Sequence, residues 1–484
     1  MSRAQDRSGP GTLSEARDRL EMLADPQSFL ELGSRARHRV TAFDMQRRRP
    51  LGDGVVTGVG RIDDRPVALF AQDPTALGGS LGETHASKIQ RVMDWSARSR
   101  MPVVGLIDSG GARIQEGVSA LDAYGRIFRA NVQQSGRVPQ LSVILGSCAG
   151  GAVYSPALTD VVVMRRGAAH MFLTGPKVVR AVTHEDVRAD ELGGSAVHSR
   201  RSGIAHLIAE DLEDALDLTR RVLSYLPSSC WAELPKSLPV PSEPMPEVPG
   251  DPRRSYDVRG VVRATVDRGS FLELLSQFAR NIVIGFARME GCPVGIVANQ
   301  PMALAGTLDI DSAEKAARFV RMCDAFGLPL VTLVDTPGFL PGTRQESGGV
   351  IRKGAKLLYA YAEATVPKVT VVLRKAFGGA YIVMNSKPLG ADAVFAWTGA
   401  ELAVMGAEGA VDVIYRRDLD ADPGCRDHLI HLYKREATAA QISAERLSVD
   451  EIIDPAETRT VLAMTLRSLT GTLRPRFRHD NLPQ

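Results

Sequence analysis

Two Gly-Gly pairs stand where the backbone itself could do chemistry. Gly150-Gly151 and Gly378-Gly379 each follow an apolar run typical of a buried strand, and each precedes a stretch with a helical pattern. Glycines there let the backbone approach a ligand closely, and the N–H groups that open the following helix point outward. Such preorganised donors form an oxyanion hole, which stabilises charge that develops during a reaction. The alternative is that the glycines only permit tight packing; two copies at equivalent positions favour catalysis.

A third glycine-rich turn, SGGARIQEG, spans residues 109–117. Gly110, Gly111 and Ala112 could cradle a phosphate or a thioester, and Arg113 could pair with an anion. A solvated loop without a ligand would have a similar composition. We expect the binding role.

No nucleophile with a partner base is recognisable. Cys148 lies in GSCAGG but has no histidine in a partner motif, so a small packed thiol is the favoured interpretation over a nucleophile. The histidines lack metal-ligand spacing, and we expect no metal. No phosphate-binding G-x-x-x-x-G-K-[ST] loop is present, which excludes that mode of ATP binding. Oxyanion holes without a side-chain base point to a reaction in which the substrate or a carried cofactor supplies the base.

The elements that must position these turns occur twice. PVVGLIDSGG from Pro102 returns as PLVTLVDTPG from Pro329, and PQLSVILGSCAGGA from Pro139 returns as PKVTVVLRKAFGGA from Pro367, at offsets of 227 and 228. The helical stretch around Lys88 matches that around Lys315 at the same offset of 227. Self-similarity at one offset across three blocks predicts an internal duplication.

Each block alternates buried strands with helices, which predicts an α/β fold of parallel β/α units. The proline-rich stretch LPKSLPVPSEPMPEVPGDP can form neither a helix nor a central strand. We therefore predict a first domain over residues 1–233, a linker over 234–252 and a second domain over 253–484.

Composition excludes several classes of function. The chain of 484 residues has a net charge of +3 and no Lys/Arg-rich tract that stands out, which gives no sign of nucleic-acid binding. Its five scattered cysteines form no C-x-x-C pair and suit a reducing compartment. A polar N-terminus and the lack of a long apolar run predict a soluble, cytoplasmic protein without a membrane segment.

These blocks together closely resemble the carboxyltransferase (β) subunits of biotin-dependent acyl-CoA carboxylases, such as those for propionyl-CoA and acetyl-CoA. The resemblance runs from Arg19 to Arg459. The segments that carry it are GGSLGETHASKI, DSGGARIQEGV, CAGGAVYSPALTD, FLTGPKVV, FVRMCDAFGLPL, DTPGFLPGTRQE, GAKLLYAYAEATVPKVTV, FGGAY and AVMGAEGAV.

The resemblance implies two crotonase-like domains per chain, in oligomers that are commonly hexamers, with active sites where the first domain of one subunit faces the second of another. Gly150 and Gly151 would hold the thioester oxygen of an acyl-CoA as its enolate forms. Gly379 and Ala380 would hold the ureido oxygen of biotin, in a cofactor turn that includes Gly378 and Tyr381. Carboxybiotin would release CO2, the biotin anion would take the α-proton, and the enolate would attack CO2.

The sequence has no biotinyl-lysine motif such as A-M-K-M and no ATP-grasp features. The resemblance therefore implies separate partner chains, a biotin carboxylase and a biotin carboxyl carrier. A decarboxylase or transcarboxylase subunit acting on a malonyl-type CoA would use the same chemistry in reverse. A non-catalytic scaffold is a third interpretation, which the intact Gly-Gly turns argue against.

Several positions depart from the family pattern. Thr398 follows Trp397 where the family usually has proline, GSCAGG replaces GPCAGG, and the segment LYKREATAAQISAERLSVDEIIDP replaces the usual NPYxAAxxGYVDxVI run. We expect the last helices to pack differently and the chain to be a specialised paralogue. Ile382 stands where propionyl-CoA carboxylase-like members carry Asp, and we expect it to line the acyl pocket and to widen the accepted chain length.

Overall fold

The computed structural model describes residues 14–251, 253–469 and 479–483 and divides into two compact units. The first comprises residues 1–233 with 479–483, and the second residues 234–478 with 484. The first unit thus ends where the sequence predicts the start of the linker. Residues 234–251 carry neither helix nor strand and belong to the second unit. Residues 479–483, expected in the second domain, lie in the first because Asn481 donates to Ser135 Oγ and Asp160 Oδ1, each over 2.9 Å.

The first unit is built around one sheet of eight strands in the order β1-β2-β3-β4-β5-β6-β8, with β7 paired to the end of β5. Pairing is parallel from β3 onward and antiparallel among β1, β2 and β3. The strands are β1 (Leu30–Leu32), β2 (Val55–Ile62), β3 (Arg65–Gln72), β4 (Val103–Ser109), β5 (Gln140–Ala149), β6 (Val161–Arg165), β7 (His170–Phe172) and β8 (Leu207–Ala209).

A second sheet repeats this plan in the second unit, in the order β9-β10-β11-β12-β13-β14-β16 with β15 paired to β13. The strands are β9 (Leu272–Leu274), β10 (Ile282–Met289), β11 (Cys292–Asn299), β12 (Leu330–Thr336), β13 (Lys368–Phe377), β14 (Ala393–Trp397), β15 (Glu401–Ala403) and β16 (Glu451–Ile453). The irregularities in strand pairing also recur. The register between β4 and β5 shifts just before Ser109, and that between β12 and β13 shifts just before Thr336. The internal duplication and the α/β class are confirmed, but each sheet is mixed, because its first three strands form an antiparallel edge.

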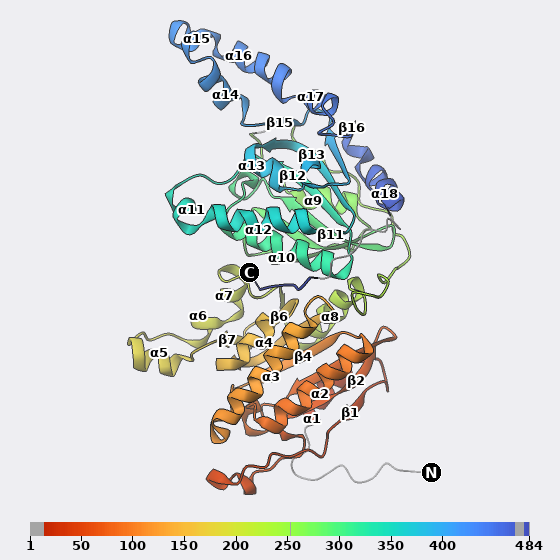
Figure 1. Ribbon diagram of the computed structural model, residues 1–484, viewed down its shortest axis with the longest axis vertical. Coiled ribbons are helices and arrows are strands. Elements are labelled where there is room, and N and C mark those ends of the chain that lie inside the picture. The colour runs from red at the N-terminus through yellow and green to blue at the C-terminus, as the bar shows by residue number, and fades with distance from the viewer. Residues whose placement is uncertain (1–13, 252, 470–478, 484) are drawn as a thin grey trace. The chain divides into compact units, whose positions relative to one another are not determined.

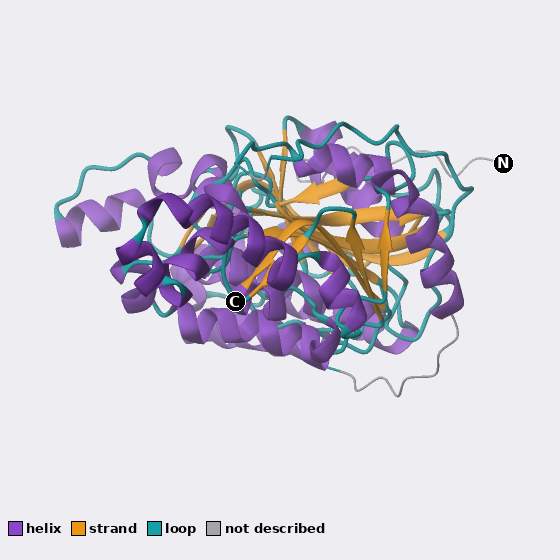
Figure 2. Ribbon diagram, turned by 90° about the horizontal axis from the view of Figure 1, so that it is seen from above, coloured by secondary structure: helices purple, strands orange, loops and turns teal. Residues whose placement is uncertain are grey.

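Helices lie outside the strands, as Figures 1 and 2 show. In the first unit α2 and α3 pack together, and in the second α10 and α12 do so. Helices of the first unit are α1 (Ser14–Leu23), α2 (Glu83–Ser99), α3 (Val118–Gln134), α4 (Tyr154–Ala157), α5 (Pro176–Thr183), α6 (Ala189–Gly193), α7 (Ser195–Arg200) and α8 (Leu212–Tyr225). Helices of the second are α9 (Val258–Thr265), α10 (Ile310–Phe326), α11 (Thr343–Gly348), α12 (Val350–Glu363), α13 (Gly378–Val383), α14 (Ala407–Ile414), α15 (Arg416–Ala421), α16 (Arg426–Tyr433), α17 (Ala440–Glu445) and α18 (Thr458–Leu469).

Sequence periodicity explains why these elements form. On α2 the buried positions Ala86, Ile89, Val92 and Met93 recur every three or four residues and face the sheet. The central strands are apolar on both faces and are covered on both faces, as parallel strands require. Because side chains fill the two faces, only the loops at the strand ends are left to build a site.

Candidate active site

The two Gly-Gly turns have matching geometry at the carboxyl ends of β5 and β13. Gly150 has φ 63° and Gly378 has φ 58°, a left-handed conformation that favours glycine. A Cβ on Gly150 would have no atom within 4 Å, and one on Gly151 would come no closer than 3.5 Å to Tyr124. A Cβ on Gly379 would lie 3.9 Å from Phe339. Space beside the backbone is therefore open at Gly150, Gly151 and Gly379, whereas a Cβ on Gly378 would lie 3.2 Å from Val404 O. A 3-10 turn (Gly150–Val153) and α4 follow the first, and α13 follows the second.

Backbone hydrogen bonds fix the 109–117 turn beside the first Gly-Gly pair. Gly110 N–H donates to Gly78 O over 3.0 Å, and Leu81 N–H donates to Gly111 O over 2.8 Å. Gly111 has φ 98°, and a Cβ there would lie 2.7 Å from Ala149 O, the carbonyl that precedes Gly150. Such close approach tolerates only glycine. Gly110 is exposed, whereas Ala112 is half-buried.

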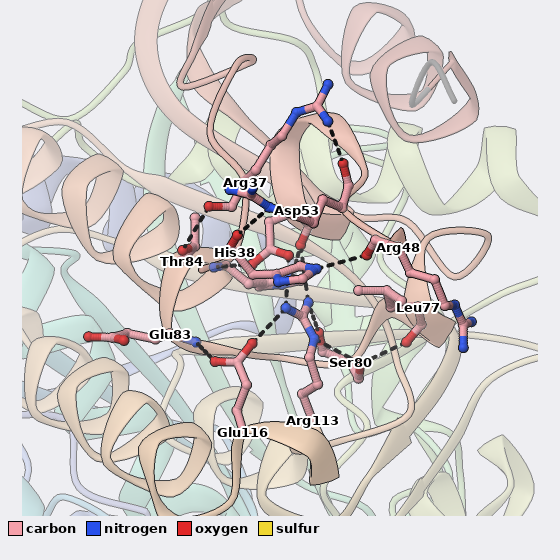
Figure 3. Close-up of polar contacts among 12 residues, drawn as sticks. Arg37, His38, Arg48, Asp53, Leu77, Ser80, Glu83, Thr84, Arg113 and Glu116 are labelled. Atoms are coloured by element: carbon pink, nitrogen blue, oxygen red, sulfur yellow. Dashed lines mark hydrogen bonds and ion pairs between the residues drawn. The ribbon is translucent and has the colours of Figure 1, made fainter. Parts of the chain in front are cut away.

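Arg113 points inward and braces this region (Figure 3). Its side chain is 1% exposed, and one terminal nitrogen lies 2.8 Å from both Asp53 Oδ1 and Glu116 Oε1. The other donates to Ser80 O over 2.8 Å. The guanidinium thus joins three loops and faces these partners, whereas the sequence predicts that it pairs with a substrate anion. Within the described residues its part is to hold the 109–117 turn in place.

Burial shapes the electrostatics around Arg113. Desolvation raises the pKa of Asp53, and the nearby Arg113 charge opposes that rise. Burial, reinforced by the charges of Arg113 and Lys88, lowers the pKa of His85 well below its usual value. His85 N–H donates to Asp53 Oδ2 over 2.9 Å. Glu116 Oε2 accepts from Glu83 N–H over 2.7 Å and so caps the start of α2.

Two buried lysines at equivalent positions hold strand entries in both halves. Lys88 Nζ donates to Gly52 O over 2.9 Å and also to Val55 O. Lys315 Nζ donates to Leu275 O over 2.9 Å and to Ile282 O over 2.8 Å. Desolvation lowers the pKa of Lys88 to about 8 and that of Lys315 to about 7. Both ammonium groups bind carbonyls of the loop that leads into β2 or β10, which explains why the lysine recurs at an offset of 227.

A buried ion pair in the second half joins β12 to β13, the strand that leads into the second Gly-Gly turn. Arg374 Nε donates to Asp335 Oδ2 over 2.8 Å, and Tyr256 donates to the same oxygen over 3.0 Å. Arg374 also donates to the carbonyls of residues 249, 251 and 254, so it ties the end of the linker to β13. In the first half Asp108, the counterpart of Asp335, instead accepts Ser147 N–H over 3.1 Å.

The surface beside the second turn is apolar. Tyr381 is half-buried, and burial raises its pKa. Ile382 is 44% exposed. A cavity of about 450 Å³ adjoins this turn and is lined by residues that include Phe339, Pro341, Val350, Ile351, Leu358 and Val383. Ile382 precedes the cavity residue Val383 along α13 without lining this cavity itself.

Cys148 is fully buried, and burial raises the pKa of its thiol. This confirms a packed thiol, since the thiolate is the nucleophilic form. The sequence patterns do not predict the buried networks that contain Asp53, His85, Glu116 and Arg374. One signal was present: Asp53 lies between two glycines in LGDGV, an unusual place for an acid that leads into a strand.

Among the described residues no group of three or more His, Cys, Asp or Glu could hold a metal ion. In the same residues, each helix is too short or too polar to cross a membrane.

Comparison with known proteins decides the family. Residues 12–482 match the carboxyl transferase domain family. The chain belongs to the carboxyl transferase family. It is 51% identical to the propionyl-CoA carboxylase beta chain of Saccharopolyspora erythraea over 97% of this chain and 90% of that protein. It is 49% identical to the methylmalonyl-CoA carboxyltransferase 12S subunit of Propionibacterium freudenreichii subsp. shermanii, over 97% and 91% of the two chains.

Solved structures place this carboxyl transferase family member in the same fold. A crystal structure of transcarboxylase 12S, described as a hexamer with methylmalonyl-coenzyme A and methylmalonic acid bound, matches with a TM-score of 0.93 and 49% identity over 97% of this chain and 92% of that one. A single-chain, multi-domain long-chain acyl-CoA carboxylase matches with a TM-score of 0.81 and 32% identity over 93% of this chain and 45% of that one. The predicted crotonase-like carboxyltransferase fold is confirmed.

Proposed function

We propose that this carboxyl transferase moves a carboxyl group from carboxybiotin, carried on a separate protein, to the α-carbon of a short- to medium-chain acyl-CoA. The observation that carries the proposal is the pair of equivalent Gly-Gly turns, each with a left-handed first glycine and open space beside its second glycine. Two preorganised donor sites suit a transfer in which negative charge develops on two different oxygens.

The acceptor side of the reaction belongs to Gly150 and Gly151. Loss of the α-proton from an acyl-CoA places negative charge on the thioester oxygen, and backbone N–H groups aimed at that oxygen stabilise the enolate more than the ground state. The 109–117 turn, braced by Arg113, keeps the wall beside these glycines fixed. Cys148, which precedes this turn on β5, is a buried thiol with a raised pKa and is therefore unsuited to take the α-proton.

The donor side belongs to Gly378, Gly379, Ala380 and Tyr381. A biotin ureido group needs backbone donors and an apolar wall for its ring, and the second turn offers both: the open glycine backbone and the apolar cavity lined by Phe339 and Val350. When bound, carboxybiotin supplies the carboxyl carbon and the nitrogen that accepts the α-proton. Gly379 and Ala380 hold the ureido oxygen, and the apolar wall limits water, which would otherwise intercept CO2.

The partners of this proposal are a biotin carboxylase and a biotin carboxyl carrier. A homohexamer is the proposed assembly, as the description of the transcarboxylase 12S structure reads. For acyl selectivity we propose that Ile382, an exposed apolar side chain next to the donor turn, widens the accepted chain length beyond propionyl. The reverse reaction on a malonyl-type CoA is a second candidate, because the 12S relative at 49% identity is named a methylmalonyl-CoA carboxyltransferase.

Reconstitution tests this function. The purified chain is combined with a biotin carboxylase, a biotinylated carrier, ATP, labelled bicarbonate and acyl-CoAs from C2 to C8. Acid-stable label in an α-carboxylated acyl-CoA is the expected result. Omitting ATP and supplying methylmalonyl-CoA with the carrier tests the reverse direction. Absence of labelled product with every acyl-CoA, by a chain that remains folded, contradicts the proposal.

A further inference from the structure

One face of α3 packs against the acceptor turn, Gly150-Gly151, and against the residues that follow it. Tyr124, Phe128 and Asn131 are spaced by four and then three residues, so their side chains share one face of the helix. Their partners come in the same order along residues 151–155, where the turn passes into α4. Figure 1 shows α3 beside α4, and the two helices are in contact. We call these three residues the α3 cluster.

The ring of Tyr124 bounds the space beside the second glycine of the turn. This side chain is 4% exposed, and a Cβ on Gly151 would lie 3.5 Å from its Cδ2 and 3.7 Å from its Cε2. The hydroxyl, which is near Ser109, completes no hydrogen bond of normal geometry among the described residues. Tyr124 and Ala152 also line a cavity of only about 20 Å³. Packing beneath the turn is therefore nearly complete, and it is the ring that supports the turn.

Phe128 and Asn131 hold the residues that follow the turn. The rings of Tyr124 and Phe128 are stacked with their centroids 5.7 Å apart, and the ring of Tyr154 meets Phe128 edge-on at 5.8 Å. Ser155 Oγ donates to Asn131 Oδ1 over 3.0 Å. Asn131 Nδ2 in turn donates to the side chain of the first residue of β5 over 2.9 Å. The start of α4 is thus tied to α3 by aromatic contacts and by a buried hydrogen bond.

The same helix begins at the other wall of the acceptor site. Gly117, the last residue of the 109–117 turn, directly precedes α3. That turn is braced at its centre by the buried Arg113. One helix therefore connects the 109–117 turn, at its N-terminal end, with the acceptor turn, along its side. Because protein interiors are densely packed, the side chains on this face of α3 determine how far the two turns stand apart.

The second half supports its Gly-Gly turn by another route. At the offset of 227, Phe339 stands where the first half has Ala112. A Cβ on Gly379 would lie 3.9 Å from the Phe339 ring, and a Cβ on Gly354 of α12 would lie 3.1 Å from it. A ring from the loop after β12 therefore has the place that a ring from α3 has in the first half. Since the two supports come from different elements, a change in the α3 cluster should act on the acceptor turn alone.

We propose that Tyr124 is a positioning residue, which together with Phe128 and Asn131 holds the N–H groups of the acceptor turn where the enolate oxygen forms. This inference rests on the proposed function, and it concerns residues that act through the turn rather than on the substrate. Donors that are already aimed need no reorganisation as charge develops. A turn that is free to move therefore loses binding of the transition state more than binding of the acyl-CoA.

Kinetics separate this role from a purely structural one. Tyr124→Leu should lower kcat for propionyl-CoA about ten-fold or more and change KM by less than about two-fold, because the lost interaction is made in the transition state. Phe128→Leu, at a half-buried position that tolerates the change more easily, should lower kcat in the same way. Tyr124→Phe keeps the ring and should retain most of the wild-type kcat.

Tyr225→Leu is the matched control, because it removes a buried tyrosine from another helix of the same unit. Tyr225 is 3% exposed and is the last residue of α8. This variant should lower the unfolding temperature, as the loss of a buried ring does, without lowering kcat. If Tyr225→Leu lowers kcat as much as Tyr124→Leu does, the effect is one of general destabilisation and the inference is overturned.

Hydrogen exchange tests the inference without turnover. Amide exchange of residues 148–157 is followed by mass spectrometry in the folded full chain. It should be faster in Tyr124→Leu and Phe128→Leu than in the wild type, and unchanged in Tyr124→Phe and Tyr225→Leu. This readout remains even if the wild type carboxylates no acyl-CoA, so it distinguishes a failure of the proposed function from a failure of this inference. Exchange that is the same in all the variants overturns the inference, as does a Tyr124→Leu variant that has a raised KM and an unchanged kcat.

Discussion

Replacing Arg113 with methionine probes the buried network beside the acceptor turn. The change keeps most of the volume and removes the charge that faces Asp53 and Glu116, both within 2.8 Å. Breaking a buried pair by removing one partner costs about 3–5 kcal/mol, because the remaining carboxylates stay buried and unpaired. With a shift of about 2–4 °C per kcal/mol for a unit of this size, thermal unfolding should occur roughly 6–20 °C lower.

The pH dependence of that loss identifies its cause. In the folded wild type, desolvation already raises the pKa of Asp53 despite Arg113. Without Arg113 the pKa rises further, so the folded state is favoured when Asp53 is protonated and loses stability as the pH rises through that higher pKa. The difference in unfolding temperature from the wild type should therefore be larger at pH 8 than at pH 5.

The second half supplies a matched control for this experiment. At an offset of 227, Leu340 and Thr343 stand in place of Arg113 and Glu116, so the same fold forms there without this network. The triple variant Arg113→Met/Asp53→Asn/Glu116→Gln should therefore regain most of the lost stability, since its amides still accept from the N–H groups of His85 and Glu83. Thermal unfolding followed by circular dichroism measures all three proteins. The reasoning is refuted if Arg113→Met lowers the free energy of unfolding by less than about 1 kcal/mol. It is also refuted if the loss is no smaller at pH 5 than at pH 8 and the triple variant does not recover stability.

Three further predictions concern the turns and their neighbours. Gly151→Pro and Gly379→Pro each remove a backbone donor and should lower kcat by about 10²–10³ while the circular dichroism spectrum stays native; near wild-type turnover would refute the oxyanion assignment. Ile382→Asp should shift selectivity toward propionyl-CoA, because it removes the apolar contact with the CH2 groups of longer acyl chains, each of which contributes about 0.8 kcal/mol when buried. An unchanged kcat/KM profile from C2 to C8 would count against this role of Ile382. Cys148→Ala should keep most of the activity because the thiol is buried and protonated, whereas a loss matching that of Gly151→Pro would make it a nucleophile.

Repetition in the sequence was enough to predict the duplicated α/β fold, because paired blocks such as those at Pro102 and Pro329 report on the same strand twice. The antiparallel edge formed by β1, β2 and β3 was not predicted, since those segments lie upstream of the paired blocks on which the comparison of the halves rested. The positions of the glycines in the sequence located the two turns. The left-handed φ values of Gly150 and Gly378 agree with the conformations that glycine readily adopts.

Networks that depend on tertiary contacts could not be predicted. Arg113 meets Asp53 from 60 residues away, and only the folded sheet brings the two loops together. Read alone, the turn at residues 109–117 predicts a cradle for a phosphate or a thioester in which Arg113 pairs with an anion. Likewise the return of residues 479–483 to the first unit depends on Asn481 meeting Asp160, a contact across 321 residues that no local pattern announces.

A single-turnover transfer tests the central claim most directly. A carrier bearing ¹⁴C-carboxybiotin is mixed with the purified chain and propionyl-CoA, without ATP or biotin carboxylase. The account predicts that the label moves to the α-carbon of the acyl-CoA with the wild type and stays on the carrier with Gly379→Pro. With no carrier present, the chain, ATP and labelled bicarbonate should give no labelled acyl-CoA. If, with the wild-type chain, the label stays on the carrier or leaves it only as CO2, the proposed transfer to the acyl-CoA is contradicted.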